Sequence, residues 1–342
     1  MTSKMEFSCI ATCIGSMPHQ DTTAACALIG KYLPDLPFWP QLPRRSLWEN
    51  MYVQFSEGFP GIIAENGKIT VGRSDQFDKA LEKLYSDYAE NILEDYRISA
   101  KYAAGLYAFK NNQNQTPKIV KGQITGPISM GLSIVDEQGR GIIYDELLAE
   151  TIAKFLHLKM AWQQKFLRGI SENTIIFVDE PYLASLGSAF VAISVDHVSG
   201  LIEDVISGIQ GLKGIHCCGG TDWSLLLKSS TDILSFDTYN YADSFSCYPA
   251  DVKAFLERGG TIAWGIVPND EDWLRKETPA SLMDRLGEAI APHSRDGISF
   301  RQVLAQSIVT PSCALTSLSV EACAEALKLL SDLSSKIRTK YF

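Results

Sequence analysis

A histidine and a cysteine stand two positions apart in the segment 214–220, which reads Gly-Ile-His-Cys-Cys-Gly-Gly. An apolar run precedes this segment and two glycines end it, so we expect it to be the end of a buried strand. Side chains alternate between the two faces of a strand, which places His216 and Cys218 on one side and Cys217 on the other. An imidazole nitrogen and a thiolate sulfur on the same side are ligands that suit zinc.

Two later residues are candidates for the remaining ligands, because a zinc ion held by protein needs three or four. Asp237 follows the short apolar run 233–236, and Cys313 follows the run 307–310. We expect Cys313 to join His216 and Cys218 in holding the metal cofactor. Asp237 is either a further ligand or a group that orients one. The alternative for the whole set is a histidine and cysteines that only fill the core.

Two carboxylates, Asp179 and Glu180, follow the β-branched and aromatic run 174–178 and precede a proline. Such a sequence can cap a helix that begins with proline, and it can also place two carboxylates where a cation such as an ammonium group binds. We assign both to the candidate catalytic site and leave the capping role open for Glu180. Ser16, after the first expected strand, and Trp264, within the seventh, are candidates for substrate binding.

These residues all come at or near the ends of expected strands, and the strands alternate with helices. We expect eight strands, at 8–16, 51–55, 118–125, 174–178, up to 218, 233–236, 261–266 and 307–310. Expected helices are 21–33, 77–107 as one or two, 144–170, 199–210, 223–230, 249–258, 279–291 and 320–338. Short-spaced alternation of this kind predicts a parallel sheet. Eight such strands predict one (β/α)8 TIM barrel over residues 1–342, with its active site at the C-terminal ends of the strands.

A proline-rich and aromatic-rich loop is expected at 34–45. Four prolines between residues 34 and 43 exclude a helix or a central strand there. The loop either covers the site as a lid or packs Trp39 against the barrel.

The composition favours a small ligand. The chain has a formal net charge of −9, a pI near 5.2 and no basic stripe, which argues against nucleic acid as a partner. No apolar run reaches the length of a membrane span, and residues 1–7 do not read as a signal, so we expect a cytoplasmic protein without membrane contact. The eight cysteines lack the dense spacing of a secreted disulfide scaffold, so metal or core roles are expected.

The set of motifs resembles the C-terminal catalytic barrel of cobalamin-independent methionine synthase, within the superfamily that also contains uroporphyrinogen decarboxylase and the methylcobalamin:coenzyme M methyltransferases. The resemblance runs through nearly the whole chain, in motifs that begin at Ile14-Gly15-Ser16 and end at Thr310-Pro311-Ser312-Cys313. Between them lie Thr125-Gly126-Pro127, Val178-Asp179-Glu180-Pro181, His216-x-Cys218 and the segment 232–237. It implies zinc held by His216, Cys218, Asp237 and Cys313, and a homocysteine amino acid group held by Ser16 and Asp179.

The implied activity is methyl transfer to a small thiol, most simply homocysteine, with methyltetrahydrofolate or a methylated corrinoid protein as donor. Zinc lowers the pKa of a bound thiol, which then attacks the methyl group as a thiolate. Gln54 stands where the family has a glutamate that pairs with the homocysteine ammonium, and Asp237 stands where it has glutamate. Alternatives are a coenzyme M-type methyltransferase, whose sulfonate would need a base such as Arg44, Arg45 or Arg73, a metal-free decarboxylase of the uroporphyrinogen type, and a non-catalytic ligand-binding barrel.

Overall fold

A parallel sheet of seven strands forms the centre of the computed structural model, which describes residues 6–65, 68–112, 116–188, 191–295 and 297–342. The strands lie in the order β1-β10-β9-β8-β7-β6-β4. Residues 1–5, which include most of the segment examined for a signal, lie outside the described residues. The seven strands are β1 (Ile10–Ala11), β4 (Val120–Thr125), β6 (Thr174–Asp179), β7 (Leu212–Cys217), β8 (Ile233–Phe236), β9 (Thr261–Val267) and β10 (Ser307–Pro311).

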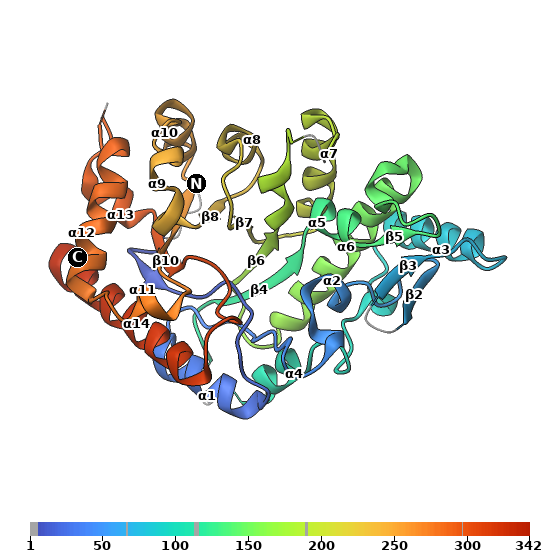
Figure 1. Ribbon diagram of the computed structural model, residues 1–342, viewed down its shortest axis with the longest axis horizontal. Coiled ribbons are helices and arrows are strands. Elements are labelled where there is room, and N and C mark those ends of the chain that lie inside the picture. The colour runs from blue at the N-terminus through green and yellow to red at the C-terminus, as the bar shows by residue number, and fades with distance from the viewer. Residues whose placement is uncertain (1–5, 66–67, 113–115, 189–190, 296) are drawn as a thin grey trace.

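Helices connect consecutive strands and surround the sheet on its outer side (Figure 1). Helix α5 begins at Pro127, a residue that suits the first position of a helix. The expected helix 77–107 is divided into α3 and α4, and α9, α11 and α13 were not predicted. The helices are α1 (Thr22–Tyr32), α2 (Met51–Gln54), α3 (Phe77–Glu90), α4 (Ala104–Asn111), α5 (Pro127–Ser133), α6 (Glu146–Leu167), α7 (Val195–Ile206), α8 (Trp223–Lys228), α9 (Thr238–Phe245), α10 (Pro249–Glu257), α11 (Glu271–Leu274), α12 (Pro279–Ile290), α13 (Phe300–Ala305) and α14 (Val320–Tyr341).

Two apolar clusters lie on the two faces of the sheet. In β6, Ile175 and Phe177 belong to a small inner cluster, whereas Ile176 and Val178 belong to the large cluster between sheet and helices. The same alternation holds in the other long strands, as a pleated strand requires. Towards the C-terminal ends of the strands the inner face becomes polar, with Lys121, Gln123, Thr125, Asp179, His216, Ser235, Asp237 and Thr310, all of them buried. The sheet therefore encloses an apolar floor below a polar layer.

The expected strand at 51–55 is wrong, because these residues form the short helix α2. Its N-cap is Asn50, whose side chain accepts a hydrogen bond from the backbone N–H of Tyr52 at 3.1 Å. Asparagine is among the residues that start helices most readily. The second strand of an eight-stranded barrel is consequently missing between β1 and β4.

The proline-rich segment 37–41 occupies this place between β1 and β4. Its backbone pairs with the neighbouring strands through isolated parallel bridges, Phe38 to Lys121 on one side and Gln41 to Ser16 on the other. Proline has no backbone N–H to donate, so prolines 37 and 40 prevent a continuous ladder. The prediction of a closed eight-stranded TIM barrel is therefore wrong. The fold is a barrel-like α/β fold whose seven strands form a half-barrel sheet. We call the segment 37–41, with its contacts to the neighbouring strands, the seam.

Side-chain hydrogen bonds hold this seam together. Trp39 is fully buried, and its Nε1 donates to Oε1 of Gln163 at 3.0 Å. The Gln163 amide donates to the backbone carbonyl of Gln123, and the Gln123 amide donates to that of Trp39, both at 3.0 Å. The buried Lys121 ammonium donates to the carbonyl of Ile14 and to Oε1 of Gln123. Of the two alternatives for the segment 34–45, packing of Trp39 against the barrel is the one observed.

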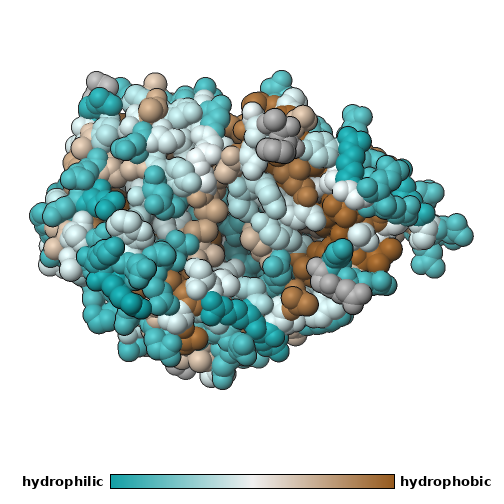
Figure 2. All heavy atoms as spheres, viewed as in Figure 1, coloured by the Kyte–Doolittle hydropathy of each residue, from teal (hydrophilic) through white to brown (hydrophobic). Residues whose placement is uncertain are grey.

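A small second sheet flanks the barrel, in the order β2 (Ile62–Glu65), β3 (Lys68–Val71) and β5 (Val135–Asp136). It was not predicted. Figure 2 shows hydrophobic residues gathered on this face near the small sheet, while much of the remaining face is hydrophilic. Ile63 of β2 keeps 45% of its surface exposed.

No helix among the described residues combines the length and the apolar character that crossing a bilayer requires.

Replacement of His293 by phenylalanine should reduce the loss of unfolding free energy that occurs as the pH becomes acidic. His293 packs against Phe245 and Trp264, and neither ring nitrogen has a partner among the described residues. Burial lowers its pKa from 6.5 to about 4, so between these values the unfolded chain binds a proton that the folded chain does not. The contribution of neutral His293 to the free energy of unfolding is complete above pH 6.5. It falls by up to about 3 kcal/mol as the pH approaches 4.

Urea unfolding of wild type and His293→Phe at pH 8, 6 and 5 measures the effect, with His197→Phe on helix α7 as the control. The variant should gain stability relative to wild type as the pH falls. Parallel profiles for wild type and His293→Phe would contradict the assignment.

Candidate metal centre

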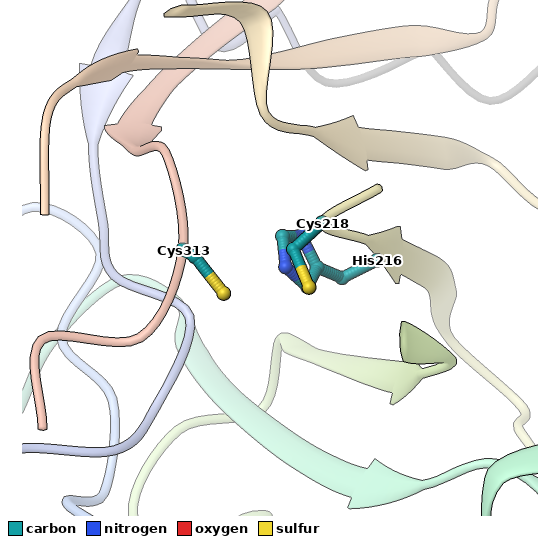
Figure 3. Close-up of side chains that lie close together, drawn as sticks. All are labelled: His216, Cys218 and Cys313. Atoms are coloured by element: carbon teal, nitrogen blue, oxygen red, sulfur yellow. The ribbon is translucent and has the colours of Figure 1, made fainter. Parts of the chain in front are cut away.

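Three side chains with metal-binding atoms converge at the C-terminal edge of the sheet. His216 is near the end of β7, Cys218 follows that strand directly, and Cys313 lies two residues beyond β10. One ligand atom of each lies within 4.8 Å of the other two. Figure 3 shows Cys313 reaching from the segment after β10 towards His216 and Cys218 on the other side. Strands β7 and β10 are separated by two others, so the curvature of the sheet is what brings the three together.

The intervening cysteine lies on the opposite face, in agreement with the expected alternation. Cys217 is fully buried in the cluster between sheet and helices, where its thiol donates to the carbonyl of Gly219 at 3.5 Å. Burial raises the pKa of Cys217 to about 12. A thiol in this state is a core residue and a poor metal ligand.

The ring of His216 is oriented by Ser235, its direct neighbour on β8. Nδ1 of His216 lies 3.0 Å from Oγ of Ser235, and Nε2 is buried without a hydrogen-bond partner among the described residues. A buried polar atom without a partner is costly, and ligation satisfies it. With Nδ1–H donating to Ser235, the lone pair of Nε2 is available to a metal ion.

The two thiols lie close to each other and to the His216 ring. The interaction with Cys313, followed in effect by that with His216, lowers the pKa of Cys218 against the opposing effect of burial. The interaction with Cys218 raises the pKa of Cys313. The two pKa shifts have opposite directions, so Cys218 loses its proton before Cys313 does. A bound cation would favour the loss of both protons.

The donor set fits a zinc ion. One imidazole nitrogen and two sulfurs are borderline and soft donors of the kind that zinc takes. Donors of a tetrahedral zinc ion lie about 3.3 to 3.8 Å apart, since zinc bonds to nitrogen and sulfur are about 2.0 to 2.3 Å. Separations within 4.8 Å are close to this geometry. The unpartnered Nε2 of His216 points to the same role.

Asp237 lies outside this group of three. It directly follows β8, and its side chain accepts two hydrogen bonds from Asn240 at the start of helix α9. Burial raises its pKa, whereas the bonds from Asn240 lower it. The structure thus places Asp237 near the cluster in the role of a helix cap.

Asp179 points into the enclosed polar layer at the end of β6. Its Oδ1 is buried and has no partner among the described residues. Burial raises the pKa of Asp179 to about 6, while Lys121 and His216 act in the opposite direction. A buried carboxylate oxygen of this kind, beside the candidate metal ligands, can accept a hydrogen bond from a donor group of a bound molecule.

Glu180 points to the other face of the sheet. Its Oε1 accepts from the backbone N–H of Ile128, and its Oε2 from the N–H and the hydroxyl of Ser129, at 2.6 to 2.9 Å. Burial raises the pKa of Glu180 to about 7, and these donors lower it. Glu180 therefore caps helix α5, and the structure does not bring it to the cluster. The cap that the sequence left open, on a helix beginning at Pro181, is not formed, because the Glu180 side chain makes no capping hydrogen bond to the 3-10 turn there.

Gln54 and Trp264 are not brought to the cluster either. The Ser16 side chain contacts the seam, and its backbone carbonyl accepts from the N–H of Leu315, two residues after Cys313, at 3.0 Å. The Ser16 hydroxyl lies 3.4 Å from Oε1 of Gln41, whose amide donates to Oε1 of Gln54 at 2.7 Å. The Gln54 amide donates to the carbonyl of Tyr102 at 2.6 Å, so both ends of this buried side chain are bonded. Trp264 packs fully buried among outer aromatic side chains, because its position in β9 faces the helices.

Four residues near the site were not predicted. Ser235 and Lys121 lie on the inner face, and strand alternation from Asp237 and Gln123 would have placed them there. Tyr52 and Tyr182 lie with ring centroids 5.8 Å apart. Burial raises the pKa of Tyr52, and Tyr182 and Cys218 act in the same direction, which places this half-buried pair beside the thiols. Tyr52 was missed because its segment was expected to be a strand.

Solved structures with the same fold include two proteins of named activity. One is a B12-independent methionine synthase from a Shewanella species in complex with selenomethionine, with 16% identity, TM-score 0.60, and coverage of 97% of this chain and 98% of that chain. The other is a methyltransferase from Methanosarcina mazei, with 12% identity, TM-score 0.58, and coverage of 100% and 95% respectively. No protein-family model matches the chain, and no curated protein matches its sequence. At these identities the likeness is one of fold.

Replacement of Ser235 by alanine should weaken zinc binding by about 10- to 100-fold, because the His216 ring loses the group that orients it. Competition with a chromophoric chelator measures the Kd. Ser307→Ala is the matched control, since Ser307 is also a buried strand serine with two hydrogen bonds but faces the helices. Equal zinc affinity in Ser235→Ala and wild type would contradict this role.

Replacement of Gln54 by glutamate should lower the free energy of unfolding by about 1 to 3 kcal/mol. A carboxylate still accepts from Gln41 but sets an oxygen against the Tyr102 carbonyl in place of a donor. Urea unfolding measures the loss, with the exposed Gln138→Glu as control. An unchanged stability would show that this position accommodates a carboxylate.

Proposed function

We propose that this chain is a zinc-dependent methyltransferase that moves a methyl group to a small thiol, homocysteine, and so forms methionine. The donor would be methyltetrahydrofolate or a methylated corrinoid protein. The observation that carries the proposal is the convergence of His216, Cys218 and Cys313 at the C-terminal edge of the sheet. That edge is where barrel-type enzymes place their active sites. The fold shared with a methionine synthase and a methyltransferase supports the choice.

The chain's own residues suit this chemistry. His216 through Nε2, with Cys218 and Cys313, would hold zinc, which when bound supplies a positive centre that favours thiolate over thiol at neutral pH. Ser235 fixes the His216 ring, so that the donors are in place before the metal binds. A methyl group transfers without a proton being added or removed at carbon, and accordingly the proposal requires no acid-base pair at the reacting carbon.

The polar layer beside the cluster suits an amino acid thiol. Asp179 offers a buried carboxylate oxygen without a partner, which an ammonium group would satisfy. Two of the three donors of Lys121 are already bonded, to Ile14 and Gln123. Asp179 is therefore the residue that we propose for binding the acceptor, with Ser16 beside the seam as the second expected contact.

The arginines that a sulfonate acceptor would need are engaged elsewhere. Arg45 pairs with the buried Glu49 at 2.8 Å, Arg73 pairs with Asp145, and Arg44 donates to the carbonyl of Ser317 at 3.2 Å. This favours homocysteine over a coenzyme M-like thiol.

Purified, chelator-free protein should contain close to one zinc ion per chain by elemental analysis. Cys218→Ser and Cys313→Ser should lose the metal and all methyl transfer to homocysteine, because each removes a thiolate donor. Cys217→Ser is the matched control and should retain both, since its thiol faces the helices. Methylcobalamin and methyltetrahydrofolate are tested separately as donors.

Equal loss of zinc in all three variants would contradict the assignment of ligands. Wild-type protein that stays free of metal after zinc is offered under reducing conditions would overturn the methyltransferase proposal. Zinc bound as described, without transfer from either donor, would instead indicate a ligand-binding barrel.

A further inference from the structure

Asp237 differs from the three clustered ligands in how its side chain is used. Its Oδ1 accepts from the backbone N–H of Asn240 at 3.0 Å, and its Oδ2 accepts from the side-chain amide of the same residue at 2.7 Å. Asp237 is the N-cap of α9, with non-helical backbone angles (φ −71°, ψ 88°) and a helix that begins at Thr238. Both carboxylate oxygens are therefore bonded, whereas Nε2 of His216 is buried without a partner among the described residues.

The packing of α9 fixes the position of this cap. Phe245, near the end of α9, stacks on Phe236 with ring centroids 4.3 Å apart and meets Trp264 edge-on at 6.0 Å. Phe236 is the residue directly before Asp237, so the aromatic contact and the cap hold the same strand end against the same helix. Asp237 is not in the group whose ligand atoms lie within 4.8 Å of one another. To reach a metal ion held by that group, its side chain would have to move and disturb the cap on this helix.

The net charge of the centre also argues against Asp237 as a metal ligand. Neutral His216 and the thiolates of Cys218 and Cys313 balance the two positive charges of a zinc ion. A bound carboxylate would make the centre negative and oppose the arrival of a third thiolate. Three protein donors also leave one tetrahedral position open, as in sites that bind substrate at the metal.

We propose that Asp237 is a positioning residue that starts α9, and that the metal is held by His216, Cys218 and Cys313 alone. A metal ion held in this way would leave a position for the acceptor thiol, which would bind there as a thiolate after losing its proton to solvent and would displace no protein ligand. This inference rests on the proposed zinc site and concerns how that site is completed.

Asp237→Asn separates the two roles, because asparagine caps helices as well as aspartate but is a poor zinc ligand. The variant should keep one zinc ion per chain, with a Kd within threefold of wild type. X-ray absorption of the zinc protein without thiol should show two sulfur donors and one nitrogen donor from the chain in both proteins. Asp222→Asn is the matched control, since Asp222 caps α8 through the N–H of Ser224.

Asp237→Ala removes the cap as well. It should lower the urea midpoint of the metal-free protein, as Asp222→Ala does, and still retain zinc. This readout distinguishes a helix cap from a ligand, because loss of a ligand alone leaves the stability of the metal-free protein unchanged.

A tenfold or greater loss of zinc affinity in Asp237→Asn, with unchanged stability of the metal-free protein, would overturn the inference. So would a carboxylate oxygen in the wild-type zinc shell that disappears in Asp237→Asn. Failure of the wild type to bind zinc, or retention of zinc by Cys218→Ser, would instead count against the proposed function.

Discussion

The rest of the structure depends on one constraint, which is that a segment without a regular strand bridges the two edges of the curved sheet. The curved sheet runs from β4 through β7 to β10 and β1, and the segment 37–41 returns from β1 to β4. His216 and Cys313 meet only because this curvature is maintained. Prolines in the segment remove donors from the ladder. Side-chain amides and Lys121 take over the hydrogen bonding that a second strand would have provided.

The use of side-chain hydrogen bonds in place of a strand determines which polar residues remain available for chemistry. Gln41, Gln54, Gln123 and Gln163 are all buried, and each is bonded within the seam. Buried polar networks stabilise a fold when every member is satisfied. Near the candidate metal donors, by contrast, Nε2 of His216 and Oδ1 of Asp179 are buried without a partner among the described residues, as is Oγ1 of Thr310 in the same polar layer. The seam is satisfied internally, whereas these atoms are not.

The sequence was sufficient for features that depend on local periodicity. Alternation along one strand separated Cys217 from His216 and Cys218, and the end of another expected strand located Cys313. It was insufficient where one residue type serves two purposes. Gln54 was expected in a strand at the site, whereas it ends a helix that Asn50 starts, and its amide is used in the seam. An irregular seam leaves no periodic signal, so its contacts become visible only in three dimensions.

The same ambiguity applies to carboxylates that follow strands. A residue at the end of a barrel strand stands at the start of the next connection, where a capping carboxylate and a catalytic one have the same sequence context. The face of the sheet to which the side chain points separates capping from catalytic carboxylates only in part. Glu180 faces outward and caps α5, but Asp237 faces inward and still caps α9. Asp179 faces inward, and its Oδ1 has no partner in the part of the chain that the structure describes. Hydrogen bonding therefore decides which of the three is available to a ligand, and it selects Asp179.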